Sequence, residues 1–156
     1  MMILNRLTLA AAFAAAWLLA LPALANLGAE SEESTNEDWL AGKAAVETKD
    51  WKTAADRLAK AAAAEPKNAD IQNWLGFSQR KLGNLDAAFA AYNEALRLNP
   101  SHKAAHEYIG EAYLMSGKLD KAEQHLADLQ RLCTPIPCEE YKDLKRAVDD
   151  YKKAKK

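Results

Sequence analysis

This 156-residue chain has no excess of basic residues, few β-branched side chains and only two cysteines. Its 21 Lys and Arg do not outnumber its 22 Asp and Glu, and the formal net charge is −1. A dedicated nucleic-acid binder usually carries a clear basic excess, so we expect no nucleic-acid partner. Alanine is abundant instead, as in the run 61–64, and alanine is the strongest helix former. The composition therefore predicts an all-α protein.

The motifs that mark common enzyme classes are also missing. The sequence has no glycine-rich phosphate loop, no H-E-x-x-H and no G-x-S-x-G. Glu107 and Glu111 lie four residues apart, a spacing that puts both carboxylates on one helical face. Because no partner base accompanies them, we interpret them as charge on a binding surface. We expect no enzymatic activity and no cofactor.

Residues 1–25 have the pattern of a secretory signal. Arg6 precedes an almost unbroken apolar run over 7–21, and the small-residue cleavage motif Ala-Leu-Ala occupies 23–25. We predict cleavage after Ala25, export to the periplasm, and no membrane span in the mature chain. The run is short for a membrane helix, which needs about 20 apolar residues. An uncleaved N-terminal anchor is the alternative interpretation.

Several residue columns recur every 34 positions after that segment. Gly42, Gly76 and Gly110 keep this interval, and a glycine inside a helix lets the paired helix cross close by. Pro66 and Pro100 end the first two units, because proline cannot continue a helix. The other columns with this period are Ala54, Ala88 and Ala122; Trp51, Leu85 and Leu119; and Leu58, Tyr92 and Leu126. The period predicts three similar helix pairs.

These units resemble the tetratricopeptide repeat family. The best match runs from Asn73-Trp74-Leu75-Gly76-Phe77 to Leu96-Arg97-Leu98-Asn99-Pro100, and the unit around Gly110 matches nearly as well. The first unit is degenerate, with Ala41 in place of Leu75 and Ile109. The resemblance implies an α-solenoid, a right-handed superhelix of antiparallel helix pairs. We place the flexible acidic leader at 26–35 and the three repeats at 36–132, as about 36–66, 69–100 and 103–132.

In this family the first helix of each pair lines a concave groove that usually holds peptides or partner proteins. The resemblance assigns the following residues to such a partner-binding groove: Trp39, Lys43, Asn73, Phe77, Arg80, Glu107, Glu111 and Leu114. Trp39 and Phe77 are predicted aromatic anchors. Lys43 and Arg80 would meet a carboxylate, and the two glutamates would attract a basic group. The carboxylate clamp that some members use for chaperone C-termini is absent, since only Lys43 fits its pattern.

The chain ends in a predicted cap, residues 133–156. Tyr141, Leu144, Val148 and Tyr151 recur there at helical spacing and form one apolar stripe. A solenoid needs such a terminal element with a polar outer face.

The only two cysteines, Cys133 and Cys138, flank a proline-rich turn before the cap. In an oxidising compartment we predict a structural disulfide that fixes the angle of the cap helix. A thiol-redox or metal role for the two cysteines is the alternative, although their spacing is not C-x-x-C. His102 and His106 could share a helix face. No third ligand lies at a matching spacing, and we interpret them as ordinary surface histidines rather than a metal site.

We therefore predict an exported scaffold or adaptor that binds an unknown protein or peptide in its groove. An accessory protein with chemistry at Cys133 and Cys138 is the second hypothesis. Self-association through exposed repeat ends is the third.

Overall fold

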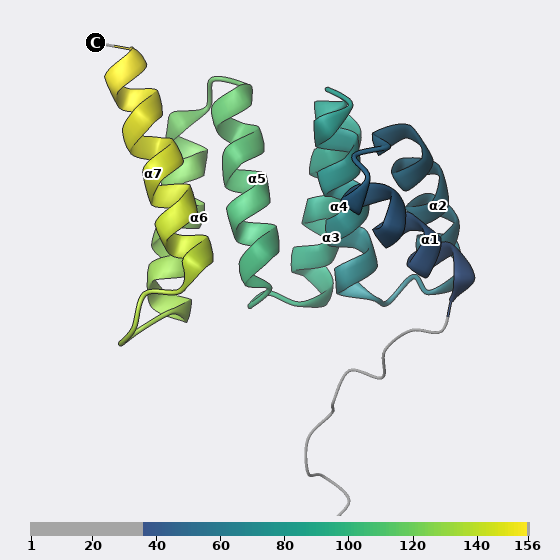
Figure 1. Cartoon of the computed structure of the whole chain (residues 1–156). Helices are drawn as coiled ribbons and strands as arrows, with labels where there is room; N and C mark the ends of the chain where they lie inside the picture. Colours follow the sequence, from purple (N-terminus) through teal and green to yellow (C-terminus); the bar gives the residue numbers. More distant parts are fainter. Residues whose placement is uncertain (1–35, 156) are drawn as a thin grey trace, which may run out of the picture. The chain divides into compact units, whose positions relative to one another are not determined.

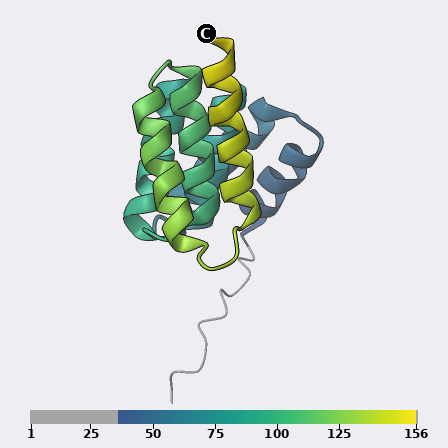
Figure 2. The same cartoon turned by 90° about the vertical axis from the view of Figure 1, so that its left-hand side faces the viewer.

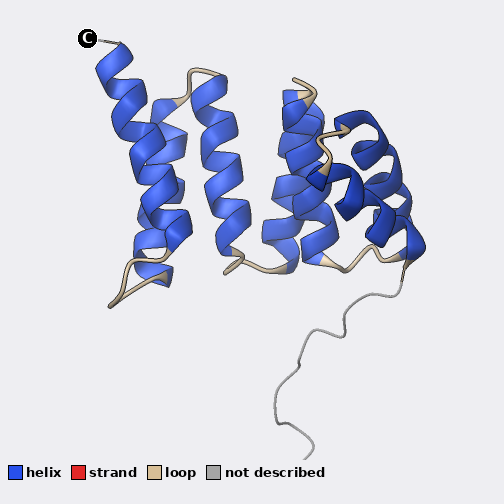
Figure 3. Cartoon of the chain, in the orientation of Figure 1, coloured by secondary structure: helices blue, strands red, loops and turns tan. Residues whose placement is uncertain are grey.

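The computed structural model describes residues 36–155, and seven helices occupy this part of the chain. They are α1 (Glu37–Glu47), α2 (Trp51–Ala64), α3 (Ala69–Lys81), α4 (Leu85–Leu98), α5 (Lys103–Met115), α6 (Leu119–Leu132) and α7 (Glu139–Ala154). Residues 36–155 contain no strand, which confirms the all-α prediction (Figure 3). None of these helices combines the length and the apolar character that crossing a membrane requires. The predicted signal at 1–25 and leader at 26–35 lie outside the described residues.

Local sequence explains where the helices begin and how the pairs turn. The side chains of Asn36, Asp50 and Asn68 accept hydrogen bonds from backbone N–H groups in the first turns of α1, α2 and α3. The tight connections inside the second and third pairs contain Gly83 at φ 81° and Gly117 at φ 76°. Glycine adopts this left-handed backbone without steric cost. The helices therefore follow one another as α1–α2, α3–α4 and α5–α6 (Figure 1).

The recurring glycines have the predicted packing role in the first two pairs. A Cβ at Gly42 would lie 2.7 Å from Cγ of Leu58, and one at Gly76 would lie 2.6 Å from Cδ1 of Tyr92. Leu58 and Tyr92 are fully buried at these crossings. Each glycine thus leaves room for a large side chain on the second helix of its own pair.

Gly110 differs from this expectation, because its neighbour belongs to α7 and not to the second helix of its own pair. A Cβ at Gly110 would lie 2.6 Å from Cδ2 of Leu144. Leu144 follows Gly110 by one 34-residue period, so it stands where a fourth repeat would have its glycine. No described helix follows α7. The large apolar side chain of Leu144 packs against Gly110 of α5.

The cap prediction is confirmed. Leu144 and Val148 of α7 are buried in one core cluster with Leu114 and Leu129. Figure 2 shows α7 lying alongside both α5 and α6. The apolar stripe of α7 therefore closes the end of the repeat array.

The predicted bond between the two cysteines is also confirmed, whereas its role in fixing the angle of the cap helix stays a prediction. Cys133 and Cys138 are bonded across a Cα–Cα distance of 5.4 Å, which joins the end of α6 to the start of α7. The peptide bond between Thr134 and Pro135 in this connection is cis.

Candidate partner-binding face

Phe77 contacts three other aromatic side chains, and the four residues come from three helices. Its ring centroid is 5.0 Å from that of Tyr108 on α5, 5.5 Å from Trp74 on α3 and 5.8 Å from Trp51 on α2. We call these four residues the aromatic cluster. All four are partly exposed, so they offer a partner a rigid apolar surface.

Arg80 is already engaged inside the protein. Its side chain is 8% exposed, and Nη1 lies 2.6 Å from Oε2 of Glu111. Its Nε donates a hydrogen bond to the Tyr92 hydroxyl at 3.3 Å. The guanidinium carbon is 5.4 Å from the Phe77 ring centroid and 5.6 Å from that of Tyr108. The expectation that Arg80 meets a partner's carboxylate does not fit this geometry. The guanidinium is buried and already bonded to Glu111 and Tyr92, so few of its N–H groups can reach a partner.

Glu107 has a different environment. It is partly buried, and within residues 36–155 it makes no hydrogen bond or ion pair. Burial raises the pKa of its carboxyl to about 7, with further contributions from Glu111, Asp143 and Glu140 in that order. The last two residues belong to α7. We call Glu107, Asp143 and Glu140 the acidic cluster.

Tyr108 connects the two clusters. Its ring belongs to the aromatic cluster, and it follows Glu107 directly on α5. Burial raises the pKa of its hydroxyl, and Glu107 and Glu111 raise it further. The side chain of Glu111 forms an ion pair with Arg80, whereas Glu107 has no ion-pair partner in the described part of the chain. The carboxyl of Glu107 therefore lies near the Tyr108 side of the aromatic cluster.

Three predicted groove residues are more buried than we expected. Trp39 is 6% exposed and packs in the core of the first pair, so it is not an exposed aromatic anchor. Leu114 is 8% exposed because it lies in the core cluster shared with α7. Asn73 is 2% exposed, and its Oδ1 accepts no hydrogen bond from the described part of the chain. Lys43 lies over the Trp39 ring, with Nζ 5.1 Å from the ring centroid.

The sequence interpretation missed other residues of this face. In the sequence Trp51 fits a packing column, and no pattern singles out Tyr108 as a groove residue. Glu140 and Asp143 belong to a helix that we interpreted solely as a cap. Their contribution depends on how closely α7 approaches α5, which the repeat period does not specify. Whether the eight predicted groove residues bind a partner stays a prediction.

His102 and His106 do not form the pair on one helix face that their spacing suggested. His102 Nδ1 accepts a hydrogen bond from the Ala105 backbone N–H at 3.2 Å, and Nε2 lies 3.0 Å from Oδ1 of Asp70. His106 is 7% exposed, so it is not the surface histidine we expected. Its Nδ1 faces Nδ1 of His125 on α6 at 2.9 Å. Burial, and then the neighbouring His106, lower the pKa of His125 to about 4.

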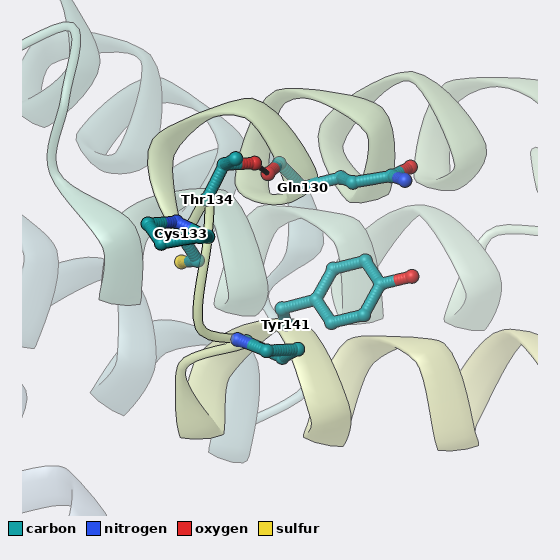
Figure 4. A pocket seen from close by; sticks show the side chains of 6 residues that line it. Gln130, Cys133, Thr134 and Tyr141 are labelled. Carbon is teal, nitrogen blue, oxygen red and sulfur yellow. Dashed lines mark hydrogen bonds between the residues drawn. The ribbon is translucent and has the colours of Figure 1, made fainter.

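A pocket of about 150 Å³ lies against the disulfide loop (Figure 4). Gln130, Cys133, Thr134, Pro135, Pro137 and Tyr141 line it. The Thr134 hydroxyl donates a hydrogen bond to the backbone oxygen of Gln130 at 2.7 Å. Cys133 is 7% exposed, and its sulfur is already bonded to Cys138. The alternative thiol-redox or metal role of this pair stays a prediction.

Comparisons with known proteins bear on the fold. The family model described as tetratricopeptide repeat matches residues 40–101 and 78–135. No match is found among the curated proteins.

Three similar solved structures carry the same architecture. One is the type III secretion translocator chaperone SycD of Yersinia enterocolitica, with a TM-score of 0.68, 17% identity, and coverage of 76% of this chain and 83% of that one. The TPR2B domain of yeast Sti1, solved in complex with pHsp70, has a TM-score of 0.69, 18% identity, and coverage of 76% and 95%. PcrH, solved with the chaperone binding region of PopD, has a TM-score of 0.69, 17% identity, and coverage of 84% and 100%. These likenesses establish the helix-pair solenoid.

Proposed function

Because this chain belongs to the tetratricopeptide repeat family, we propose that it is an exported, non-enzymatic scaffold that binds a protein segment on the face formed by the aromatic and acidic clusters. The observation that carries this proposal is the partly buried carboxyl of Glu107, which has no ion-pair partner among residues 36–155 and lies near Tyr108 of the aromatic cluster. The neighbours solved with Hsp70, with PopD and with a YopD peptide support a binding role for the fold.

The chemistry of this face favours a segment with an apolar side chain next to a lysine or arginine. Apolar atoms would cover the aromatic cluster, where large rigid rings make good anchors. A cation would meet Glu107, and a hydrogen bond to a charged group contributes about 1.5–3 kcal/mol. Arg80 already neutralises Glu111, so Glu107 is the carboxyl of α5 that would accept the cation.

Such binding would depend on pH with a defined sign. The pKa of Glu107 is raised to about 7, so a large fraction of its carboxyl is protonated in neutral solution. A cation binds the ionised form, and affinity should therefore rise as the pH increases through that value. Proton release on binding would accompany this change.

The export part of the proposal rests on two features. The pattern at 1–25 is that of a cleavable signal, and Cys133 and Cys138 form the kind of disulfide that persists in oxidising compartments. We propose the periplasm as the location.

Peptide selection followed by affinity measurement tests the binding proposal. Peptides selected from a displayed library on the folded protein should combine apolar residues with Lys or Arg. Fluorescence anisotropy at about pH 8 should then show weakening by about tenfold or more in Phe77→Ala and in Glu107→Gln, since each loses an interaction of about 1.4 kcal/mol. Trp39→Ala is not a suitable variant, because Trp39 is part of the core.

Glu94→Gln is the matched control. Glu94 lies on α4, pairs with Arg97 and belongs to neither cluster, so its neutralisation should leave affinity unchanged. Selected peptides without basic residues, or equal affinity for Glu107→Gln and wild type, would contradict the proposed recognition. Circular dichroism establishes that each variant is folded.

A further inference from the structure

Three side chains with metal-ligating atoms converge between α5 and α6. They are His106 on α5 and His125 and Asp128 on α6, and one ligand atom from each lies within 4.8 Å of the others. His106 Nδ1 is 2.9 Å from His125 Nδ1 and 3.8 Å from Oδ2 of Asp128. His106 is buried and the other two are partly exposed, so the cluster is open to solvent on one side.

Neighbouring groups hold these ligand atoms in place. His106 Nε2 lies 3.0 Å from the Pro100 carbonyl oxygen. A carbonyl oxygen only accepts, so Nε2 carries the proton, and Nδ1 of the neutral ring presents its lone pair to His125. Arg131 contacts Oδ1 of Asp128, while Oδ2 is the atom that faces His106. Partners of this kind on the far side of a ligand are the usual means of orienting it toward a metal.

The repeat geometry explains why His106 and His125 meet. The two residues are 19 positions apart, and the same positions of the first repeat carry Asp38 and Arg57, whose side chains contact at 2.8 Å. This pair of positions therefore brings two side chains into contact in both the first and the third repeat. In the first repeat they form an ion pair, and in the third they bring two imidazole rings to a centroid distance of 5.2 Å with an interplanar angle of 52°. Asp128, three residues after His125, lies on the same side of α6.

We propose that His106, His125 and Asp128 form a binding site for a divalent first-row transition metal ion, with Zn²⁺ as the first candidate. Zinc binds histidine nitrogen and carboxylate oxygen in tetrahedral sites with Zn–N distances of about 2.0–2.1 Å, which places ligand atoms about 3.3 Å apart. The His106–His125 nitrogen distance would open by about 0.4 Å, and the His106–Asp128 distance would close by about 0.5 Å. Three protein ligands leave a fourth position for water or an external ligand.

One internal rearrangement accompanies binding. In the metal-free protein with both rings neutral, His125 donates its Nδ1 proton to His106 Nδ1. For both Nδ1 atoms to bind the metal, that proton moves through solvent to Nε2 of His125. The ring keeps its proton count, and the metal replaces the hydrogen bond between the histidines.

Zinc titration of the full chain without a polyhistidine tag tests this site. Both cysteines are in the disulfide, so no thiol competes for the metal. Isothermal titration calorimetry should show one Zn²⁺ per chain, and Co²⁺ should give the visible absorption of a tetrahedral nitrogen–oxygen site. His125→Gln and Asp128→Asn should each weaken binding by about 100-fold or more, beyond the 10–100-fold typical of outer-shell changes.

His102→Asn is the matched control. His102 also contacts a carboxylate, that of Asp70, but no third ligand from residues 36–155 joins this pair. Asparagine keeps the ability to cap α5. The control should bind Zn²⁺ with wild-type affinity. No stoichiometric binding by wild type, or undiminished binding by both His125→Gln and Asp128→Asn, would overturn the proposal.

Discussion

Gly76 leaves space that the ring of Tyr92 occupies. Replacing a helical glycine with alanine normally gains about 1 kcal/mol of helix propensity. Here the added Cβ would lie 2.6 Å from Cδ1 of a fully buried ring, and overpacking of this kind costs about 1–3 kcal/mol. The net effect of the two contributions is a free energy of unfolding for Gly76→Ala that is lower by up to about 2 kcal/mol, measured by urea denaturation.

Ala90→Gly provides the reference for the propensity contribution. Ala90 is exposed in the middle of α4, so this change should cost about 1 kcal/mol through propensity alone. If Gly76→Ala stabilised the protein by a similar amount, the close crossing of α3 and α4 would be refuted.

Glu107 should make stability depend on pH. Its pKa is raised from 4.5 to about 7 in the folded protein, chiefly by burial. The folded state therefore binds the proton more tightly than the unfolded chain, and this contribution to stability is lost as the pH rises between those two values. Because the side chain is only partly buried, the loss should be about 1–2 kcal/mol after allowance for solvent screening.

Glutamine at this position mimics the protonated carboxyl and removes the effect. Glu107→Gln should unfold at a higher urea concentration than wild type at about pH 8 and at nearly the same concentration at about pH 5. Glu94→Gln serves again as control. A stability difference of the same size at both pH values would show that folding does not raise the pKa of the Glu107 carboxyl.

For single residues, the sequence predicts the place of a residue in the repeat better than it predicts the burial and the contacts of its side chain. The glycine columns and the asparagine and aspartate caps follow from period and helix chemistry alone. The burial of Trp39 and the pairing of Arg80 with Glu111 do not, because each depends on a side chain from another helix. His125 was detectable in principle, since it stands where Arg57 stands in the first repeat, opposite the position of Asp38 and His106.

Among the helices, α7 is the one whose attachment is most exposed to test. Leu144 is fully buried against Gly110, and a buried leucine changed to alanine costs about 2–5 kcal/mol. We expect Leu144→Ala to lower hydrogen-exchange protection of the α7 amides by a corresponding factor. The disulfide keeps α7 attached to α6, so the helix should open while remaining tethered.

Lys145→Ala is the matched control for that experiment. Lys145 is exposed, and its ion-pair partner within residues 36–155 is Asp149 on its own helix, a surface interaction that contributes little to stability. Equal protection of α7 in Leu144→Ala and Lys145→Ala would contradict the account of the cap.

The sequence predicts that α7 exists and which stripe it buries, but not how it leans on α5. In the first two pairs a side chain from the second helix of the same pair fills the space beside the glycine. The period therefore predicts that a side chain of α6 fills the space beside Gly110. Leu144 stands where the period would place a glycine, and its side chain fills the space beside Gly110 in place of a side chain from α6. The acidic cluster arises from this approach, and for that reason its α7 members escaped the sequence interpretation.

For the whole molecule, processing of the N-terminus is the first prediction. When the full chain is expressed in a Gram-negative host, mass spectrometry of the periplasmic fraction should find a protein that begins at Asn26. The motif at 23–25 is the physical basis, since signal cleavage follows small residues. A membrane-bound protein that retains Met1 would support the anchor interpretation instead.

The solenoid as a whole was predictable because several columns with distinct packing roles share one period. The binding face was only partly predictable. The family resemblance indicates which helices carry it, whereas the clusters on it depend on contacts between neighbouring pairs. The aromatic cluster draws Trp51, Phe77 and Tyr108 from three different helices, and no single periodic column contains them all.

Site-specific photocrosslinking in the exporting host tests the central claim most directly. A photoreactive residue at Lys81, whose ammonium group lies 5.1 Å from the Phe77 ring centroid, should crosslink to one partner through a segment that contains Lys or Arg. Glu107→Gln should strongly reduce the yield of that product, and a photoreactive residue at exposed Arg97 on α4 should not yield it. The same product from position 97, or an unchanged product in Glu107→Gln, would contradict the account.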